Sequence, residues 1–246
     1  MLGLVMLQGS ISVMSIGGYV AKKKTDHRVK VAGERRERMR KRLRNAVMAV
    51  YARRPHNGPP LVDDVIVFAD VSKATFYKYF SSVEEAIDEV GVELADEMVQ
   101  SLIKIYSGAE PPFFRMTVAT HLFLLRSVTD SVWAAFVSHT DILASDNIVL
   151  RGIKGHAEAS REAGLMTFTN LDAATTLAVG TLMEAMRQIV RGKKRPLRGY
   201  VEEVVAMILR GLGISEDVAR QAVRDSAIFI RGAAPDRLPW WRDPWT

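Results

Sequence analysis

The chain has 246 residues, of which 48% are hydrophobic and 25% are charged, ordinary values for a globular protein with one large or two smaller domains. It contains no cysteine, which excludes disulfides, thiolate catalysis, thiol redox sensing and cysteine-ligated zinc. The five histidines are scattered and no two are four residues apart, which argues against a local metal-binding motif.

Charge is distributed unevenly along the chain. Residues 22–54 hold 14 Lys and Arg and only 3 Asp and Glu, a net charge of +11, whereas the remainder is net −5. A basic segment joined to an acidic remainder is expected where a protein binds a polyanion such as nucleic acid. A solvated basic tail is the alternative.

The apolar opening, residues 1–20, does not match a signal peptide, because the three lysines that follow it should precede the apolar run. Gln8 and several serines interrupt the run, which is unfavourable for a membrane-spanning helix. We interpret residues 1–33 as a flexible basic extension, and a membrane anchor is the less favoured alternative.

Helical periodicity runs through nearly every segment after residue 34, and no run alternates as a strand would. A first helix is predicted over 34–53, ended by the proline-rich segment 55–60. A short helix over 62–69 follows, and a third begins at the N-cap Ser72. Together these signals predict a compact three-helix unit.

A capping-box pattern, Ser82 followed by Glu85, predicts a fourth helix that ends near Ser107. The segment "SGAEPP" then interrupts the chain, and longer helical segments follow. These are predicted over 113–138, 141–164, 171–192, 197–212 and 215–230, before a Trp- and Pro-rich tail over 232–246 that we expect to be irregular.

The segment "SKATFYKYF" (72–80) has two faces when it is placed on a helix. Phe76 and Phe80 are four residues apart and are predicted to pack on the preceding helices. The outward residues are hydroxyls and ammonium groups, which suit phosphates and groove edges in a helix-turn-helix. This outward set comprises Lys73, Tyr77 and Lys78, with Ser72, Thr75 and Tyr79 at the rim.

Residues 61–90 resemble the DNA-binding domain of the TetR family of bacterial transcriptional regulators. The residues that fall in register with the family's second and third helices are Asp64, Val65, Ala69, Val71, Ser72, Lys73, Thr75, Tyr77 and Phe80, and Ser82 and Glu84 match the start of its fourth helix. The sequence departs from the family pattern at Leu61, Asp70, Ala74, Tyr79 and Val83. Asp70 replaces a turn glycine and is tolerable there, because Asp enters the left-handed region more easily than most residues.

The resemblance implies an all-α fold, with a helix-turn-helix domain over 34–82 and a ligand-binding and dimerisation bundle over 83–231 that starts with the connecting helix 83–107. It implies a cytoplasmic, homodimeric repressor without a cofactor, which binds a palindromic operator in double-stranded DNA and is released by a small apolar molecule. The alternative is a DNA-binding regulator or architectural protein without an inducer. An enzyme is disfavoured, because no P-loop, G-x-G-x-x-G, G-x-S-x-G or H-E-x-x-H motif occurs.

Three sets of site residues are predicted. The DNA-binding set, from the resemblance and the helix faces, is Arg40, Arg44, Ser72, Lys73, Thr75, Tyr77, Lys78 and Tyr79. The ligand-binding set, from the aromatic region 113–168, is Phe114, His121, Trp133, Phe136 and Met166, although a lone His121 is more often a satisfied core residue. The dimer-interface set is Ala174, Ala178, Thr181, Ala185, Val201, Val205 and Ile208, for which ordinary core is the alternative.

Overall fold

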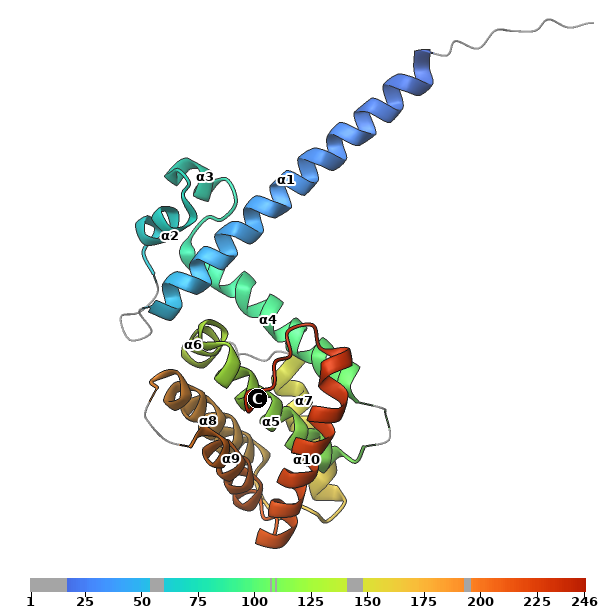
Figure 1. The fold of residues 1–246 in the computed structure, drawn as a ribbon, viewed down its shortest axis with the longest axis vertical. Coiled ribbons are helices and arrows are strands. Elements are labelled where there is room, and N and C mark those ends of the chain that lie inside the picture. Colours follow the sequence, from blue (N-terminus) through green and yellow to red (C-terminus); the bar gives the residue numbers. More distant parts are fainter. Residues whose placement is uncertain (1–16, 54–59, 107, 109, 141–147, 193–195) are drawn as a thin grey trace, which may run out of the picture. The chain divides into compact units, whose positions relative to one another are not determined.

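A computed structural model describes residues 17–53, 60–106, 108, 110–140, 148–192 and 196–246. Every ordered element among these residues is a helix, which confirms the expected all-α class (Figure 1). The chain divides into two compact units, residues 1–42 and 43–246, and the boundary falls within the first helix. No helix among the described residues is long and apolar enough to cross a membrane.

Helix α1 spans Gly17–Arg53 and therefore begins well before the predicted start at Glu34. The part assigned to a flexible extension is thus helical from residue 17 onward, and residues 1–16 lie outside the described residues. Residues 21–32 are mostly Lys, Ala, Val and Arg, without glycine or proline, so nothing in them interrupts a helix. In the first unit the residues from Glu34 to Arg38 are exposed.

The second unit opens with the predicted short helices, α2 (Val62–Ala69) and α3 (Lys73–Tyr77). Both match the sequence analysis, including Ser72 as the N-cap of α3. Their shared core is apolar and comprises Leu43, Val47, Val65, Ala69, Phe76 and Phe80, all nearly inaccessible to solvent. Aromatic spacing thus fixes which face of α3 is turned inward.

Helix α4 (Val83–Ile105) begins at the predicted cap. The Ser82 hydroxyl accepts a hydrogen bond from the Glu85 backbone N–H at 3.1 Å, and Glu85 reaches back to accept from the Ser81 N–H at 2.6 Å. The return bond ends on Ser81 instead of Ser82, one residue earlier than in a standard capping box. Two of the otherwise unpaired N–H groups at this helix start are therefore satisfied.

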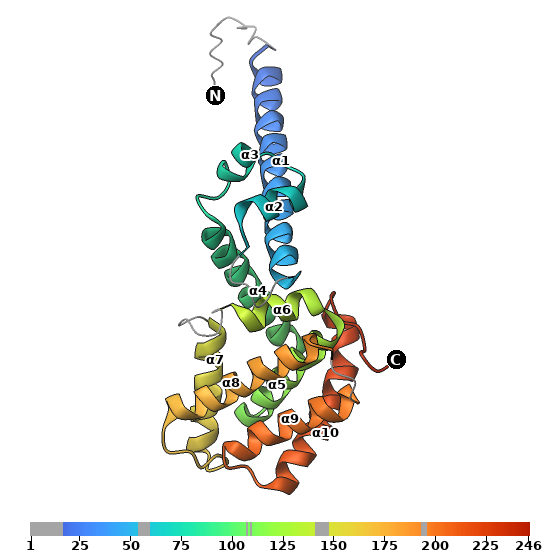
Figure 2. The ribbon, with the colours of Figure 1, turned by 90° about the vertical axis from the view of Figure 1, so that its left-hand side faces the viewer.

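The remaining helices form a bundle around α5 (Pro112–Thr129), which contacts each of the five that follow (Figures 1 and 2). These are α6 (Ser131–His139), α7 (Ile148–Glu162), α8 (Leu171–Val190), α9 (Leu197–Gly211) and α10 (Glu216–Arg237). The bundle core draws on all of them and includes the fully buried Leu122, Trp133, Met186, Val205 and Ile230.

Two predicted helices differ from the structure within 113–164. The segment 113–138 is split at Asp130, whose carboxylate accepts from the Trp133 N–H at 3.0 Å and so caps α6. Aspartate competes for backbone donors in this way and favours helix starts over helix interiors. The predicted helix 141–164 is observed from Ile148, since 141–147 lie outside the described residues.

The tail predicted to be irregular over 232–246 begins in a helix, because α10 continues through Pro235 to Arg237 and ends seven residues beyond the predicted 230. From Leu238 onward the tail is irregular as predicted, and it packs on the bundle. Trp240 donates its indole N–H to the Ser101 hydroxyl at 3.0 Å. The Arg126 guanidinium lies 4.5 Å from the ring centroids of both Trp133 and Trp240 and pairs with Glu97 at 2.8 Å. An arginine between two indoles and a carboxylate is an enclosed charge stabilised by cation–π contacts and an ion pair.

Trp240 packs over the buried Arg126. Trp240→Ala should therefore lower the free energy of unfolding by about 2–4 kcal/mol, because apolar contact and a cation–π interaction are lost. Chemical denaturation measures this change. Arg242→Ala, an exposed site in the same tail, is the matched control and should change stability little. Equal stabilities for the two variants would contradict the packing role of Trp240.

Candidate nucleic-acid interface and ligand cavity

The turn between α2 and α3 is made by Asp70, the position where the sequence departs from a glycine. Its φ of 50° and ψ of 59° place it in the left-handed region, and it is the one non-glycine with positive φ among the described residues. The Asp70 and Val71 N–H groups donate to Val67 and Ile66 carbonyls at 3.2 and 3.1 Å, which closes α2. The expectation that Asp tolerates this conformation is confirmed.

Helix α3 then starts at Ser72, whose hydroxyl accepts from the Thr75 N–H at 3.1 Å and lies 2.9 Å from the Thr75 hydroxyl. This bond satisfies a free N–H at the start of a helix of only five residues. It also fixes the rotation of the helix and therefore the direction of the side chains that follow.

The predicted division of α3 into two faces is confirmed. Phe76 and Phe80 are fully buried with ring centroids 5.8 Å apart. Tyr77 is 49% exposed, and Lys73 and Lys78 are exposed beside it. An exposed tyrosine between two lysines, held from below by two buried phenylalanines, forms a polar surface on a fixed helix.

The predicted DNA-binding residues outside α3 are placed differently. Arg44 is only 12% exposed and its guanidinium pairs with Glu89 at 2.7 Å and Glu93 at 2.9 Å, both on α4. It therefore joins α1 to α4, because two acidic residues one helical turn apart enclose the cation. This position does not support the predicted DNA contact of Arg44. Arg40 belongs to residues 1–42, the other unit.

Lys73 has an intramolecular partner that bears on its availability. Its ammonium lies 3.3 Å from an Asp63 carboxylate oxygen, and both side chains are mostly exposed. Exposed ion pairs of this kind contribute about 0–1 kcal/mol, so a phosphate or base edge can replace the carboxylate at small cost.

The bundle contains a cavity of about 280 Å³ between α4, α5, α7 and α8. Most of its wall is apolar, and four side chains that can hydrogen-bond or carry charge also line it. The apolar lining includes Leu102, Met116, Phe123, Val149, Ile153, Val179 and Leu182; the polar lining comprises Tyr106, Arg115, Thr120 and His156. An apolar hollow with a few polar groups is the usual form of a small-molecule site.

Tyr106 and Arg115 hold one another at this cavity. The Tyr106 hydroxyl donates to the Arg115 carbonyl at 2.7 Å, and the Arg115 guanidinium lies 5.3 Å from the Tyr106 ring centroid. Burial raises the pKa of Tyr106, against the effect of the nearby Arg115 charge, so its hydroxyl stays protonated. Burial, and then the Arg115 charge, lower the pKa of His156, which is therefore neutral near pH 7.

None of the five predicted ligand-binding residues lines this cavity. His121 is buried with Nδ1 2.9 Å from the Ser226 hydroxyl, and burial, then Arg231, lower its pKa to about 4, so it is a satisfied neutral core residue. Phe114 packs against Phe229 of α10 at 5.6 Å. The remaining three, Trp133, Phe136 and Met166, are buried in the core.

Helix geometry explains this difference. The stripe containing Phe114 and His121 is turned toward α10, whereas the stripe one position along, Arg115, Ala119 and Phe123, is turned toward the cavity. Because α5 is buried on several faces, its apolar pattern does not show which face meets a hollow. One signal in the sequence could have located the cavity. Arg115 and Ala119 are four residues apart on α5 and share a face, and His156 is likewise a polar residue on a largely apolar face of α7.

The predicted dimer residues are mostly interior. Ala174, Ala185, Val201, Val205 and Ile208 are buried within the single chain, and Ala178 lines the cavity. Only Thr181 of that set is exposed. Ordinary core, the alternative for this apolar stripe, is therefore what the structure contains. The exposed apolar side chains of these two helices are Leu177 and Met207.

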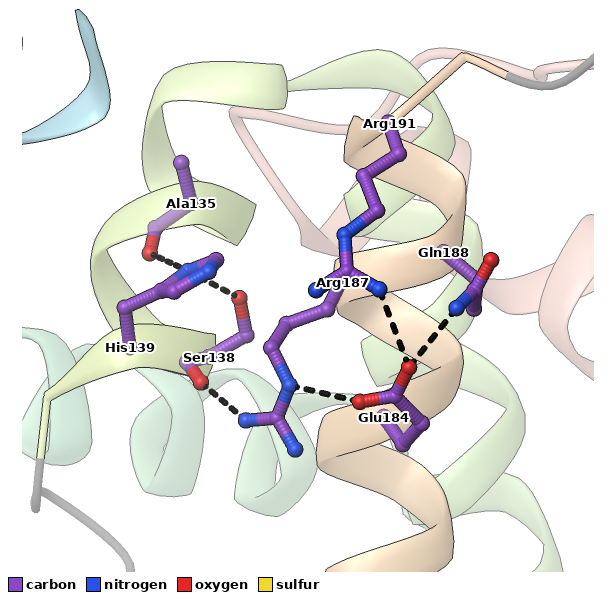
Figure 3. Close-up of polar contacts among 7 residues, drawn as sticks. All are labelled: Ala135, Ser138, His139, Glu184, Arg187, Gln188 and Arg191. Carbon is purple, nitrogen blue, oxygen red and sulfur yellow. Dashed lines mark hydrogen bonds and ion pairs between the residues drawn. The ribbon is translucent and has the colours of Figure 1, made fainter. Parts of the chain in front are cut away.

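The C-terminus of α6 receives donors from two other helices, and Figure 3 shows the one from α8. Arg187 of α8 donates to the Ser138 carbonyl at 2.5 Å and pairs with Glu184 at 2.8 Å. The Tyr51 hydroxyl of α1 donates to the His139 carbonyl at 2.9 Å, while its ring meets Phe136 edge-on at 5.3 Å. Carbonyls without intrahelical partners are thereby satisfied, and α1, α6 and α8 are joined.

No protein-family model and no curated protein sequence matches the chain. Solved structures do. RolR in complex with resorcinol is similar at 20% identity and a TM-score of 0.59 over 78% of this chain and 95% of that one. FadR from Bacillus subtilis in complex with stearoyl-CoA is similar at 16% identity and a TM-score of 0.54, over 69% of this chain and 97% of that one.

A TetR-family transcriptional regulator from Haemophilus influenzae is similar at 15% identity and a TM-score of 0.51, over 71% of this chain and 96% of that one. Similarity at this level of identity establishes the fold. The chain therefore has the fold of TetR-family transcriptional regulators, an N-terminal helix-turn-helix followed by a helical bundle.

Tyr77→Phe tests the two faces of α3. If the exposed hydroxyl contacts a phosphate, the substitution should reduce DNA affinity by about 1 kcal/mol or somewhat more, the free energy of one hydrogen bond to a charged group. The loss should be similar on specific and random DNA, because phosphates carry no sequence information. Fluorescence anisotropy titrations measure both affinities, and a thermal melt should be nearly unchanged.

Phe80→Ala is the opposing variant. It should cost about 3–5 kcal/mol of stability by leaving a cavity beneath α3, and it should weaken DNA binding only through unfolding. If Tyr77→Phe instead lowers the melting temperature and spares DNA affinity, the assignment of the two faces is inverted.

Proposed function

We propose that this chain is a homodimeric, ligand-responsive transcriptional regulator of the TetR family. In this proposal α3 binds a palindromic operator, the chain acts as a repressor, and a small molecule in the bundle cavity releases it from DNA. The observation that carries the proposal is the exposed surface of Lys73, Tyr77 and Lys78 on a helix anchored by Phe76 and Phe80. The repressor assignment follows the family resemblance.

The chemistry of α3 supports the DNA-binding step. In a helix-turn-helix the second helix enters the major groove with its first residues at base edges. Here those residues are Ser72 and Lys73, which offer a hydroxyl and an ammonium, and Tyr77 and Lys78 follow one turn later where phosphates would lie. Ala74, exposed on the same helix, adds a methyl group where the family resemblance has a glycine and the backbone would approach DNA most closely.

An exposed face on α8 and α9 supports dimerisation. Leu177 is 40% and Met207 56% exposed, and Gly180, Thr181 and Gly211 lie exposed near them in the sequence. A cyclic dimer uses the same patch on both copies, so small and apolar side chains on two neighbouring helices suit a self-complementary contact. A two-fold dimer in turn requires two inverted half-sites in the operator.

The cavity favours a regulator controlled by a ligand, and it argues against the alternative, a regulator without an inducer. Leu102, Ile103 and Tyr106, in or just after the last turn of α4, line it, and Val83 at the other end of α4 is buried. The Arg44 pairs with Glu89 and Glu93 attach the same helix to α1. A ligand that moves the end of α4 would therefore act on the helix that borders α3.

DNA affinity should depend steeply on salt, since each phosphate neutralised contributes a slope of about −0.9 in log K against log salt. Lys78→Gln should reduce that slope by about one unit per subunit and therefore by about two for the dimer, because one exposed ammonium is lost from each copy. Lys104→Gln, exposed at the end of α4, is the matched control and should leave the slope unchanged. A flat salt response in the unmodified protein would refute DNA binding through this surface and the basic segment.

Leu177→Arg and Met207→Arg should each weaken or abolish the dimer, because a two-fold contact would place the new charge against its own copy. Analytical ultracentrifugation measures the result. Val92→Arg, at a residue of α4 that is 64% exposed, is the matched control and should remain dimeric. Dimers that survive both substitutions would place the interface on another surface.

A further inference from the structure

We infer that the ligand of the bundle cavity is a compact amphipathic carboxylate, with an apolar body in the cavity and an anionic head bound by Arg115. This inference rests on the proposed ligand-controlled function. It replaces the apolar molecule expected from the sequence with a molecule that has one charged, hydrogen-bond-accepting end.

Arg115 carries the first step of the argument. It lines the cavity, and its Nε is buried with no hydrogen-bond partner among the described residues. A buried donor left without an acceptor is costly, and native structures rarely retain one without a ligand, ion or water to satisfy it. A ligand carboxylate supplies an acceptor, and a guanidinium binds it through parallel hydrogen bonds.

The rest of the Arg115 side chain is held in place. Nη2 donates to the Gly108 carbonyl at 2.9 Å, and the guanidinium lies against the Tyr106 ring. One carboxylate is near, that of Glu110, but it stands 3.9 Å from Nη2 and accepts from the Gly108 N–H at 3.1 Å. The protein's own acceptors therefore meet Nη2 and leave Nε for another group.

The charge of the cavity wall selects the sign of the ligand. No Asp or Glu is among the described residues that line it, and Arg115 is its permanent cation. His156, neutral near pH 7, adds an N–H that can donate and a ring nitrogen that can take up a proton when an anion is close. A ligand cation would face Arg115 with no lining carboxylate to balance it.

The volume of the cavity limits the size of the apolar part of the ligand. About 280 Å³ lies at the lower end of the range for small-molecule sites. Met116, Phe123, Ile153 and Leu182 give this space an apolar wall, which suits one or two rings or a medium-length chain. A long-chain acyl thioester of coenzyme A is much larger than this volume.

Matched acid and amide probes test the charge of the head group. The pairs are 4-tert-butylbenzoate, 1-naphthoate and octanoate with their uncharged primary amides, titrated calorimetrically into the full chain. At least one acid should bind about ten- to a hundredfold more tightly than its amide, the ratio for one charge-assisted hydrogen bond at about 1.4 kcal/mol per tenfold. The inference is overturned if no acid binds more tightly than its amide, including the case in which no probe binds.

Substitutions test whether Arg115 is the residue that makes the acid bind more tightly than its amide. Arg115→Gln should bring the affinity of the acid down to that of its amide, and Arg115→Lys should restore part of the difference. Arg161→Gln is the matched control, since Arg161 is exposed, pairs with Glu158 and does not line the cavity. If Arg115→Gln keeps the acid preference while folding normally by circular dichroism, the head group is bound elsewhere and the assignment is wrong.

The His156 ring gives an independent readout. In an NMR titration the pKa of His156 should rise when the acid binds and remain unchanged with the amide, because only the anion stabilises the imidazolium. Assignment by His156→Gln separates its signal from the other histidines. An unchanged His156 pKa in the acid complex would place the carboxylate away from this end of the cavity.

DNA titrations separate this inference from the proposed function. If the acids bind through Arg115 but leave DNA affinity unchanged, the ligand class stands and ligand control of DNA binding fails. If an amide binds as tightly as its acid and releases DNA equally well, ligand control stands and the carboxylate inference fails.

Discussion

The burial of helix α5 is the constraint on which the rest of the bundle depends. Residues on every side of it, from Met116 and Thr117 to Arg126 and Ser127, are almost inaccessible to solvent. A helix of this kind has to be surrounded, and it contacts α6, α7, α8, α9 and α10. Two of its hydroxyl groups are paired within the helix: Thr117 and Ser127 donate to the carbonyls of Phe113 and Phe123 at 3.0 and 2.8 Å.

The same constraint creates the cavity and connects it to helix α1. Toward α10 the packing around α5 is closed by Phe114, Phe229 and the His121–Ser226 bond, whereas toward α7 and α8 it leaves a hollow. Helix α6 follows α5 directly at Asp130, and its last carbonyls accept from Tyr51 of α1 and Arg187 of α8. Contiguous contacts therefore join α5 to α1 through α6, and under the proposed ligand control a shift of α5 would reach α1 along them.

Local signals made the helix-turn-helix predictable from the sequence. Ser72 and Ser82 are N-caps, Asp70 takes the left-handed turn, and the spacing of Phe76 and Phe80 fixes the buried face of α3. Each of these depends on residues at most a few positions apart, where helix geometry and capping determine the outcome. The proposed contacts of α3 with DNA remain predictions.

The cavity and the roles of Arg44 and Ala178 could not be predicted from the sequence, because they depend on tertiary packing. Arg44 pairs with glutamates far along the chain, and Ala178 belongs to a stripe that periodicity alone cannot assign to core, cavity or dimer contact. The early start of α1 had a local signal, an uninterrupted run of helix formers, which the charge of that segment obscured.

We propose above that an anchored α3, presented by a two-fold dimer, recognises a specific DNA sequence. The most direct test is selection of binding sites from a random double-stranded DNA pool with the full chain, followed by sequencing. We expect enrichment of an inverted repeat whose half-sites are spaced by whole turns of the duplex, about 34–36 Å each, and loss of that enrichment with Lys73→Ala. Recovered DNA without a shared inverted repeat, or the same repeat recovered by Lys73→Ala, would contradict it.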